Sequence, residues 1–174
     1  LGKASQMIGD NEKARAFWNQ VVSSYSQTIF LDDALFALGK NYENFQEFEN
    51  ARTAFEKIIK LSKDETMQSR AVFEIGQTYQ LAKDYSKALQ SYEMIQKKYP
   101  ASPVRIPALA ATAQCKALAG DSKTAINLYE QILIGARSDS TVDQSLALEP
   151  LSRLYRDQGK LQLSVDTWQK YVDQ

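Results

Sequence analysis

A spacing of 37 residues recurs along this chain and constrains its fold more than any other feature. Gly39 is followed 37 residues later by Gly76 and, after another 37, by Ala113. A second series of small residues keeps the same step, and the residue four after each of them is aromatic. The small residues are Ala14, Ala51, Ala88, Ala125 and, after a step of 39, Ser164; the aromatic residues are Trp18, Phe55, Tyr92, Tyr129 and Trp168. Self-similarity with a period of about 20 to 50 residues is typical of a solenoid built from stacked repeats.

Apolar residues within each period fall at helical spacing, which predicts two helices for every repeat. The first helix of a pair, here termed the outer helix, carries the Gly39 series, and the second, the inner helix, carries the Ala51 series. One such pair is too small to bury its own apolar face, so the fold must depend on stacking against neighbouring pairs. We expect outer helices at about residues 32–45, 66–82, 104–118 and 140–157, and inner helices at about residues 12–25, 49–61, 85–98, 123–134 and 161–172.

The repeat register divides the whole chain into a single array. Leu1 and Gly2 fall where Leu38 and Gly39 fall one repeat later, so Leu1–Ile8 is expected to be the tail of an outer helix. We therefore expect the chain to be a segment of a longer protein. The expected pieces are a partial repeat at residues 1–30 and repeats at about residues 32–65, 66–102, 103–138 and 140–174.

Two prolines refine the expected helix boundaries. Ser102 followed by Pro103 is the pattern of an N-cap and a first helical position, so an outer helix is expected to start there. Pro150 lies inside a run whose apolar spacing is helical. Because proline lacks a backbone N–H and clashes with the preceding turn, this position predicts a kink or a late helix start.

Composition excludes two classes of partner. Lys plus Arg and Asp plus Glu are equal at 21 each, without a basic cluster, which argues against nucleic-acid binding. Hydrophobic residues make up 44% and charged residues 24% of the chain, and no apolar run approaches the roughly 18 to 20 residues that cross a bilayer. We therefore expect no nucleic-acid partner and no direct membrane insertion by this segment.

The residues that most often carry catalysis and metal binding are scarce. The chain has no histidine and one cysteine, so the commonest general base and the commonest zinc ligands are missing. Cys115 lies in an alanine-rich helical run and is expected to be a small buried thiol. We therefore expect no enzyme activity, no catalytic residue, no cofactor and no metal site.

Two other groups of residues have competing interpretations. Asp32 and Asp33 could ligate a metal, but acidic pairs at this place more often form the solvated first turn of a helix. The aromatic series of the inner helices could form a ligand cage. At helical spacing beside small residues, however, it is expected to form the core.

A combination of residues in the second repeat resembles the tetratricopeptide repeat. These residues are Leu38, Gly39, Tyr42, Phe48, Ala51, Phe55 and Ile58. The resemblance implies an all-α fold without a sheet, in which antiparallel helix pairs stack into a right-handed superhelical solenoid. It also implies that the concave face, lined by outer helices, binds a partner protein or peptide. Residues 99–103 resemble junctions of bacterial envelope proteins of this family, which favours the periplasm or the outer membrane, with the cytoplasm as the alternative.

The Gly39 series (Gly39, Gly76 and Ala113) serves as the reference for counting. The residues three before and one after each member are expected to project into this concave face, and so are the leucines five after Gly76 and Ala113. An apolar strip with a few amides suits an amphipathic helix or an extended segment. The alternative is that the phenylalanines only pack against neighbouring outer helices. A carboxylate clamp of the kind found in co-chaperones of the family is not expected, since Lys40 alone is basic at the matching positions. The expected partner-binding residues are Phe36, Lys40, Phe73, Gln77, Leu81, Ala110, Gln114 and Leu118.

Three functions remain compatible with this sequence. The first is a scaffold for protein–protein interaction that binds a partner on the concave face. The second is a structural array that self-associates or continues into further repeats before Leu1 or after Gln174. The third is an accessory domain of a larger enzyme.

Overall fold

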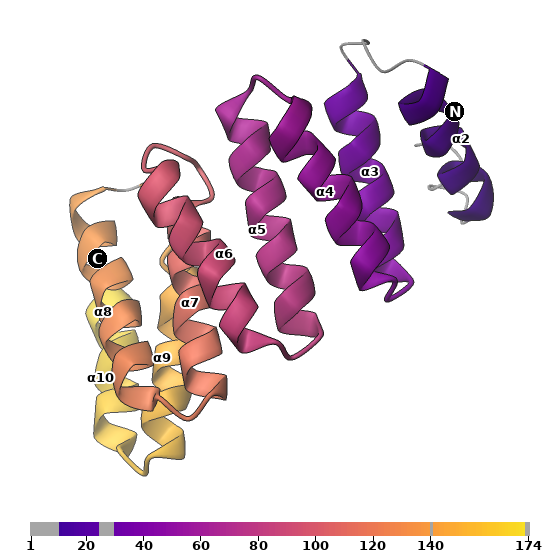
Figure 1. The fold of residues 1–174 in the computed structure, drawn as a ribbon. Coiled ribbons are helices and arrows are strands. Elements are labelled where there is room, and N and C mark those ends of the chain that lie inside the picture. Colours follow the sequence, from indigo (N-terminus) through magenta and orange to yellow (C-terminus); the bar gives the residue numbers. More distant parts are fainter. Residues whose placement is uncertain (1–10, 25–29, 140, 173–174) are drawn as a thin grey trace. The chain divides into compact units, whose positions relative to one another are not determined.

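The computed structural model describes residues 11–24, 30–139 and 141–172 (Figure 1). Within these ranges the regular secondary structure is entirely helical, and no strand occurs. The expected tail of an outer helix at Leu1–Ile8 lies outside the described residues. The helices are α2 (Asn11–Ser24), α3 (Leu31–Asn44), α4 (Phe48–Leu61), α5 (Glu65–Leu81), α6 (Tyr85–Lys98), α7 (Arg105–Leu118), α8 (Ser122–Ser138), α9 (Ser145–Asp157) and α10 (Leu161–Val172).

Helix boundaries agree with the sequence-based expectation except where a local signal was misread. The inner helix α8 continues to Ser138, four residues beyond the expected end at Ile134. The outer helix α9 begins only at Ser145, five residues after the expected start at residue 140. The N-cap residue of α9 is Gln144. Pro150 lies six residues after it, inside the helix.

The expected N-cap at Ser102 is wrong. The hydroxyl of Ser102 accepts a hydrogen bond from the backbone N–H of Val104 at 3.2 Å, which closes a turn before the helix. Helix α7 then begins at Arg105, with Val104 as its cap residue and no side-chain capping bond. Pro107 therefore occupies the first turn of α7, where a missing N–H leaves no intrahelical bond unmade.

The chain forms two compact units, residues 1–91 and 92–174, and the boundary falls within α6. In the first unit, the inner helix α4 packs between the outer helices α3 and α5. Its core centres on Phe55 and Ile58, both fully buried, with Leu35 of α3 and Ile75 of α5 around them. The aromatic residue of the inner helix thus fills the space between two outer helices.

The second unit repeats this arrangement with α8 packed between α7 and α9. Tyr129 and Ile132 of α8 are buried against Ala113 of α7 and Leu151 of α9. The expectation that the aromatic series forms the core is therefore confirmed at Trp18, Phe55, Tyr92 and Tyr129, which are at most 9% exposed.

Trp168 departs from the rest of the aromatic series. It is 44% exposed, although its indole N–H donates to the Ser152 hydroxyl at 2.9 Å. Among the described residues, α10 packs against the outer helix α9, whereas α4 and α8 each lie between two outer helices. Trp168 thus keeps one edge against α9 while much of its ring is exposed, and Leu161 and Val165 of the same helix are 63% and 59% exposed.

Gly39 is required by a close contact between the two helices of one repeat. A Cβ atom at this position would lie 2.5 Å from the Phe55 ring of α4. The ring is itself fully buried and held by α5 on its other side, so it has little room to move. The small residue of the outer helix thus makes room for the aromatic residue of its partner inner helix.

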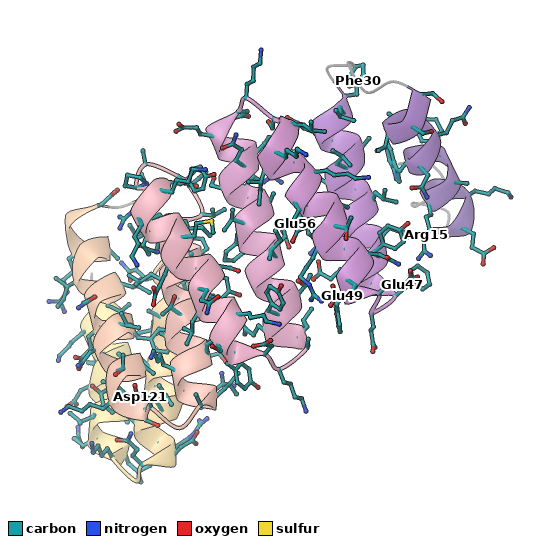
Figure 2. The ribbon with its side chains drawn as sticks, viewed as in Figure 1. Arg15, Phe30, Glu47, Glu49, Glu56 and Asp121 are labelled. Carbon is teal, nitrogen blue, oxygen red and sulfur yellow. The ribbon has the colours of Figure 1, made fainter. Side chains whose placement is uncertain are left out.

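An arginine on each of the first two described inner helices stacks on a tyrosine of the following outer helix. Arg15 of α2 lies 4.7 Å from the ring centroid of Tyr42, donates to the Asn41 side chain at 2.9 Å and pairs with Glu47 at 2.8 Å (Figure 2). Such stacking adds a cation–π attraction to the helix contact. In this first contact the Arg15 guanidinium therefore has an amide and a carboxylate as hydrogen-bond acceptors.

The second contact, 37 residues later, is incomplete. Arg52 of α4 is 6% exposed and lies 4.3 Å from the ring centroid of Tyr79. It pairs with Glu49, but its Nη1 atom is buried and has no hydrogen-bond partner among the described residues. The position of Asn41 is taken here by Thr78, whose hydroxyl donates to the Ile75 carbonyl at 2.8 Å.

Candidate functional site

The face formed by α3 and α5 in the first unit is the best-defined candidate site. These two outer helices contact each other, so the side chains predicted to bind a partner are brought together from both. Phe36 of α3 is half-buried and meets the Phe55 ring edge-on, with centroids 5.5 Å apart. One edge of Phe36 therefore belongs to the core and the rest lies at the surface of this face.

Lys40, predicted to contact a partner, is already paired within the chain. Its ammonium lies 2.7 Å from the carboxylate of Glu43 and 3.1 Å from that of Glu74 on α5. Burial lowers the pKa of Lys40, but hydrogen bonds and attraction from the two carboxylates outweigh it and raise that pKa overall. Burial raises the pKa of Glu74, and attraction from Lys40 and, to a smaller extent, from Arg70 only partly opposes this rise. Lys40 thus links α3 to α5 and offers little to a ligand.

Arg70 is the charged residue that the sequence analysis missed. Its guanidinium lies 4.6 Å from the Phe36 ring centroid, and the side chain is exposed. The Arg70 contact with the Met67 sulfur, at 3.6 Å, is a weak one. No carboxylate of the described residues lies within ion-pair distance of it. Arg70 is therefore an exposed guanidinium that stacks on an aromatic ring and also attracts Glu74, which lies beyond ion-pair distance.

The other predicted residues of the first unit differ in exposure. Phe73 and Gln77, on α5, are half-buried, and each presents part of its side chain. Leu81, at the end of α5, is 56% exposed. The predicted apolar strip in this unit therefore consists of two partly covered phenylalanines and one open leucine.

The predicted residues of the second unit lie on α7 and are described separately. Ala110 is 8% exposed and belongs to the core around Tyr129, so its methyl group offers almost no binding surface. Gln114 is exposed, and Leu118 is 55% exposed. Of the three, Gln114 and Leu118 present side chains to solvent.

The described residues show little sign of catalytic chemistry. Cys115 is fully buried, and burial raises the pKa of its thiol to about 11, which keeps it protonated and unreactive near neutral pH. In the described ranges, no three His, Cys, Asp or Glu side chains gather as a metal site would require. No helix in these ranges is both long and apolar enough to cross a membrane.

Comparison with known proteins identifies the repeat. The family model of the tetratricopeptide repeat matches residues 33–64 and 70–102, which cover α4, α6 and most of α3 and α5. The chain contains tetratricopeptide repeats. The all-α repeat fold expected from the resemblance is therefore confirmed. Tetratricopeptide repeats form scaffolds that bind other proteins and are typically non-catalytic.

Solved structures of tetratricopeptide proteins share this fold at low sequence identity. The crystal structure of MamA is 18% identical, with a TM-score of 0.71, and the match covers 99% of this chain and 93% of that one. A putative kinesin light chain from Podosopora anserina is 16% identical, with a TM-score of 0.71 and coverage of 98% and 89%. BtubC from P. vanneervenii is 14% identical, with a TM-score of 0.78 and coverage of 98% and 75%. The comparison with curated proteins found no match.

Proposed function

We propose that the α3–α5 face of the first unit binds a segment of a partner protein that carries an apolar residue next to an acidic one. The observation that supports this most is the stacking of exposed Arg70 on half-buried Phe36. A guanidinium fixed on a ring loses less conformational freedom when it binds a carboxylate, because its planar fork is already oriented. Phe36 and Phe73 then supply apolar surface beside it.

The charges around Arg70 favour an acidic ligand at one place only. Lys40 is shared by Glu43 and Glu74, so this cluster holds one positive and two negative charges. A ligand carboxylate would be repelled by that cluster but attracted by Arg70. The proposed segment therefore places its acidic residue at Arg70 and its apolar residue over Phe73, near Gln77.

The proposal is tested by selecting peptides from a displayed library that represents disordered and terminal protein segments. Peptides enriched on the wild-type chain are expected to share an acidic and an apolar residue, and a synthetic representative is then titrated by fluorescence anisotropy. Arg70→Gln is expected to weaken binding at least tenfold, because a charge-assisted pair is lost. Lys63→Gln, at an exposed position of the same unit, is the matched control and should leave the affinity unchanged.

Folding must be separated from binding in the apolar part of the test. Phe36→Ala with Phe73→Ala should keep the helical circular dichroism of the wild type and lose the peptide. Phe55→Ala, at a fully buried position, should instead lose the fold. Selected peptides that bind Arg70→Gln and the double phenylalanine variant as tightly as wild type would show that this face is not the binding site.

A second candidate function is self-association through α10 in the second unit. Leu161, Val165 and Trp168 are 63%, 59% and 44% exposed on one helix, and exposed apolar groups of this kind often mark an interface. If the chain self-associates, its apparent molecular mass in sedimentation experiments should rise with protein concentration. Leu161→Asp with Val165→Asp should return it to a monomer, and a wild-type monomer at every concentration would exclude this function.

A further inference from the structure

Two largely buried carboxylates of the α3–α5 face share one positive charge. The side chains of Glu43 and Glu74 are 11% and 14% exposed, and both meet the Lys40 ammonium, at 2.7 Å and 3.1 Å. Desolvation makes a buried charge costly unless a partner compensates it, and here one ammonium serves two carboxylates. Glu74 makes the longer of the two contacts, so its charge is the less firmly held by Lys40.

The contacts between α3 and α5 place Glu74 one helical turn from Arg70. Arg70 lies over Phe36, and Glu74, four residues after Arg70, pairs with Lys40, four residues after Phe36. These two contacts therefore lie one turn apart, about 6 Å along the helix axis. Residues four apart on a helix are surface neighbours, with Cβ atoms about 5 to 6 Å apart. A ligand carboxylate bound to Arg70 would consequently be a neighbour of Glu74 as well.

Three charged groups act on the Glu74 carboxylate. From α3, Lys40 attracts it and Glu43 repels it, and from its own helix Arg70 attracts it. One of the two attracting cations is shared with Glu43, and the other is the residue proposed to bind the ligand. The charge of Glu74 thus depends on the same guanidinium that an acidic ligand would occupy.

The cations of α4 and α6 that contact α5 lie further along that helix. Arg52 of α4 and Lys87 of α6 lie 4.3 Å and 5.3 Å from the ring centroid of Tyr79, which is five residues beyond Glu74. The remaining charged residues of α4 are exposed. Protonation of Glu74 is therefore governed by the two charged residues of α3 and by Arg70.

A ligand carboxylate at Arg70 changes the balance of charge at Glu74. It neutralises a cation that attracts Glu74, and it adds a second negative charge about one turn away. When two carboxylates share a site, the pKa of one of them is raised strongly, and that carboxyl takes up a proton. Glu74 is the one to do so, because it is largely buried, whereas the ligand carboxylate lies at an exposed guanidinium.

We propose that protonation of Glu74 regulates the α3–α5 face, so that the acidic segment binds more tightly when Glu74 is neutral and its binding draws a proton onto Glu74. This inference rests on the proposed function of that face. The two effects are reciprocal: protonation raises the affinity for the ligand by the same factor by which the ligand raises the affinity for the proton. Coupling between two sites usually amounts to a factor of about 5 to 150.

Binding should therefore strengthen as the pH falls. Burial raises the pKa of Glu74 above 4.5, so its carboxyl becomes neutral as the pH falls through that raised value. The ligand carboxyl, with an ordinary pKa of about 4, loses its own charge at still lower pH, and this loss can only weaken binding. An affinity that increases on acidification consequently originates in the protein.

Glu74→Gln tests the proposal at a fixed pH, because glutamine resembles the neutral carboxyl and its amide oxygen can still accept from Lys40. The probe is the peptide selected on the wild-type chain, in a version without histidine. At about pH 8 it should bind Glu74→Gln about fivefold or more tightly than it binds the wild type. Glu56→Gln, which removes the same charge at an exposed position of α4, is the matched control and should leave the affinity unchanged.

The pH dependence and the proton are measured on the same pair of proteins. From about pH 8 to about pH 5 the affinity of the wild type for the probe should rise, and that of Glu74→Gln should not. Calorimetry in two buffers with different ionisation enthalpies should show proton uptake on binding to the wild type and none on binding to Glu74→Gln. A probe that binds both proteins equally at every pH would overturn this inference and leave the proposed function standing.

A measurement without ligand tests the coupling between Arg70 and Glu74 directly. NMR of the isotopically labelled Glu74 carboxyl should give a higher pKa in Arg70→Gln than in the wild type, because the attraction from Arg70 is lost. An unchanged pKa would overturn the inference even if the probe binds. Failure to select any peptide that depends on Arg70 would instead overturn the proposed function, and this inference with it.

Discussion

The Arg52 guanidinium lies 4.3 Å above the ring of Tyr79, 37 residues after the Arg15–Tyr42 pair, yet it lacks the amide acceptor of the earlier pair. Asn41 accepts from Arg15 at 2.9 Å, and Thr78 stands in its place in the second pair. A buried donor without an acceptor loses the hydrogen bonds that water gives it in the unfolded chain. The contact between α4 and α5 is therefore weaker than its geometry allows.

Thr78→Asn should stabilise the protein by supplying this acceptor. Asparagine has nearly the volume of threonine, and its side-chain oxygen can reach Arg52 as Asn41 reaches Arg15. We expect the free energy of unfolding to rise by about 0.5 to 1.5 kcal/mol, the usual net value of one hydrogen bond. Urea unfolding measures it, and the reverse change, Asn41→Thr, should lower stability. A loss of stability in both variants would contradict this account.

Gly39→Ala should destabilise the first unit. The added methyl group would lie 2.5 Å from the Phe55 ring, which is fully buried. Overpacking of this kind costs about 1 to 3 kcal/mol. Gly135→Ala is the control, because nothing lies within 4 Å of that position in α8. It should raise stability by about 0.5 to 1 kcal/mol, since alanine loses less backbone entropy than glycine in a helix.

Glu74 should make stability fall as the pH rises. Its pKa in the folded chain is raised above 4.5 by burial, so its contribution is complete below pH 4.5 and is lost as the pH rises through the folded pKa. Compared with Glu74→Gln, the wild type is therefore expected to become relatively less stable as the pH rises above 4.5 and through the raised pKa of the folded state. Urea unfolding at a series of pH values tests this. An unchanged difference between the two proteins would contradict the raised pKa.

Asp84 should show the opposite dependence. Hydrogen bonds and charge from Lys87 lower its pKa below 3.8, so its stabilising contribution is present above that pH and is lost on acidification through the folded pKa. Asp84→Asn should therefore lose less stability than the wild type on acidification below pH 4, as measured by urea unfolding at a series of pH values. The two variants together distinguish a carboxyl whose pKa is raised by burial from one whose pKa is lowered by hydrogen bonds and charge from Lys87.

Cys115 should resist alkylation in the native state. Burial raises the pKa of the thiol to about 11, so almost none of it is thiolate at pH 8. Mass spectrometry after treatment with iodoacetamide should show an unmodified chain, whereas in urea the thiol should react completely. Rapid modification without urea would show that the helix around Cys115 opens readily.

The repeat period predicted the helices because it reports how residues stack, and stacking determines this fold. It could not predict the end of α8, since the inner helices α4 and α6 end without the turn that follows Ile134. The Ser102–Pro103 pattern in turn misplaced the cap of α7, because Ser102 closes a turn instead of capping the helix. These are local competitions between hydrogen bonds, and a period contains no information about them.

The candidate site was less predictable than the fold. Phe36 and Phe73 were found by their register, but Arg70 lies six residues before Gly76, at a position that other repeats fill with Asp33 and Pro107. A period predicts only residues that recur, so it could not predict a role for Arg70. The pairing of Lys40 with Glu74 joins two repeats and likewise follows only from their packing.

The unequal burial of the two tryptophans gives the chain a separate optical probe in each unit. Trp18 is 9% exposed in the first unit, and Trp168 is 44% exposed in the second. Their emission should differ in wavelength, because indole emission shifts to the red where water reaches the ring. Replacing Trp18 with Phe would leave tryptophan fluorescence as a report on the second unit alone, and replacing Trp168 with Phe would leave it as a report on the first. The unfolding of each half, and the arrival of a ligand in either one, could then be followed without any attached dye.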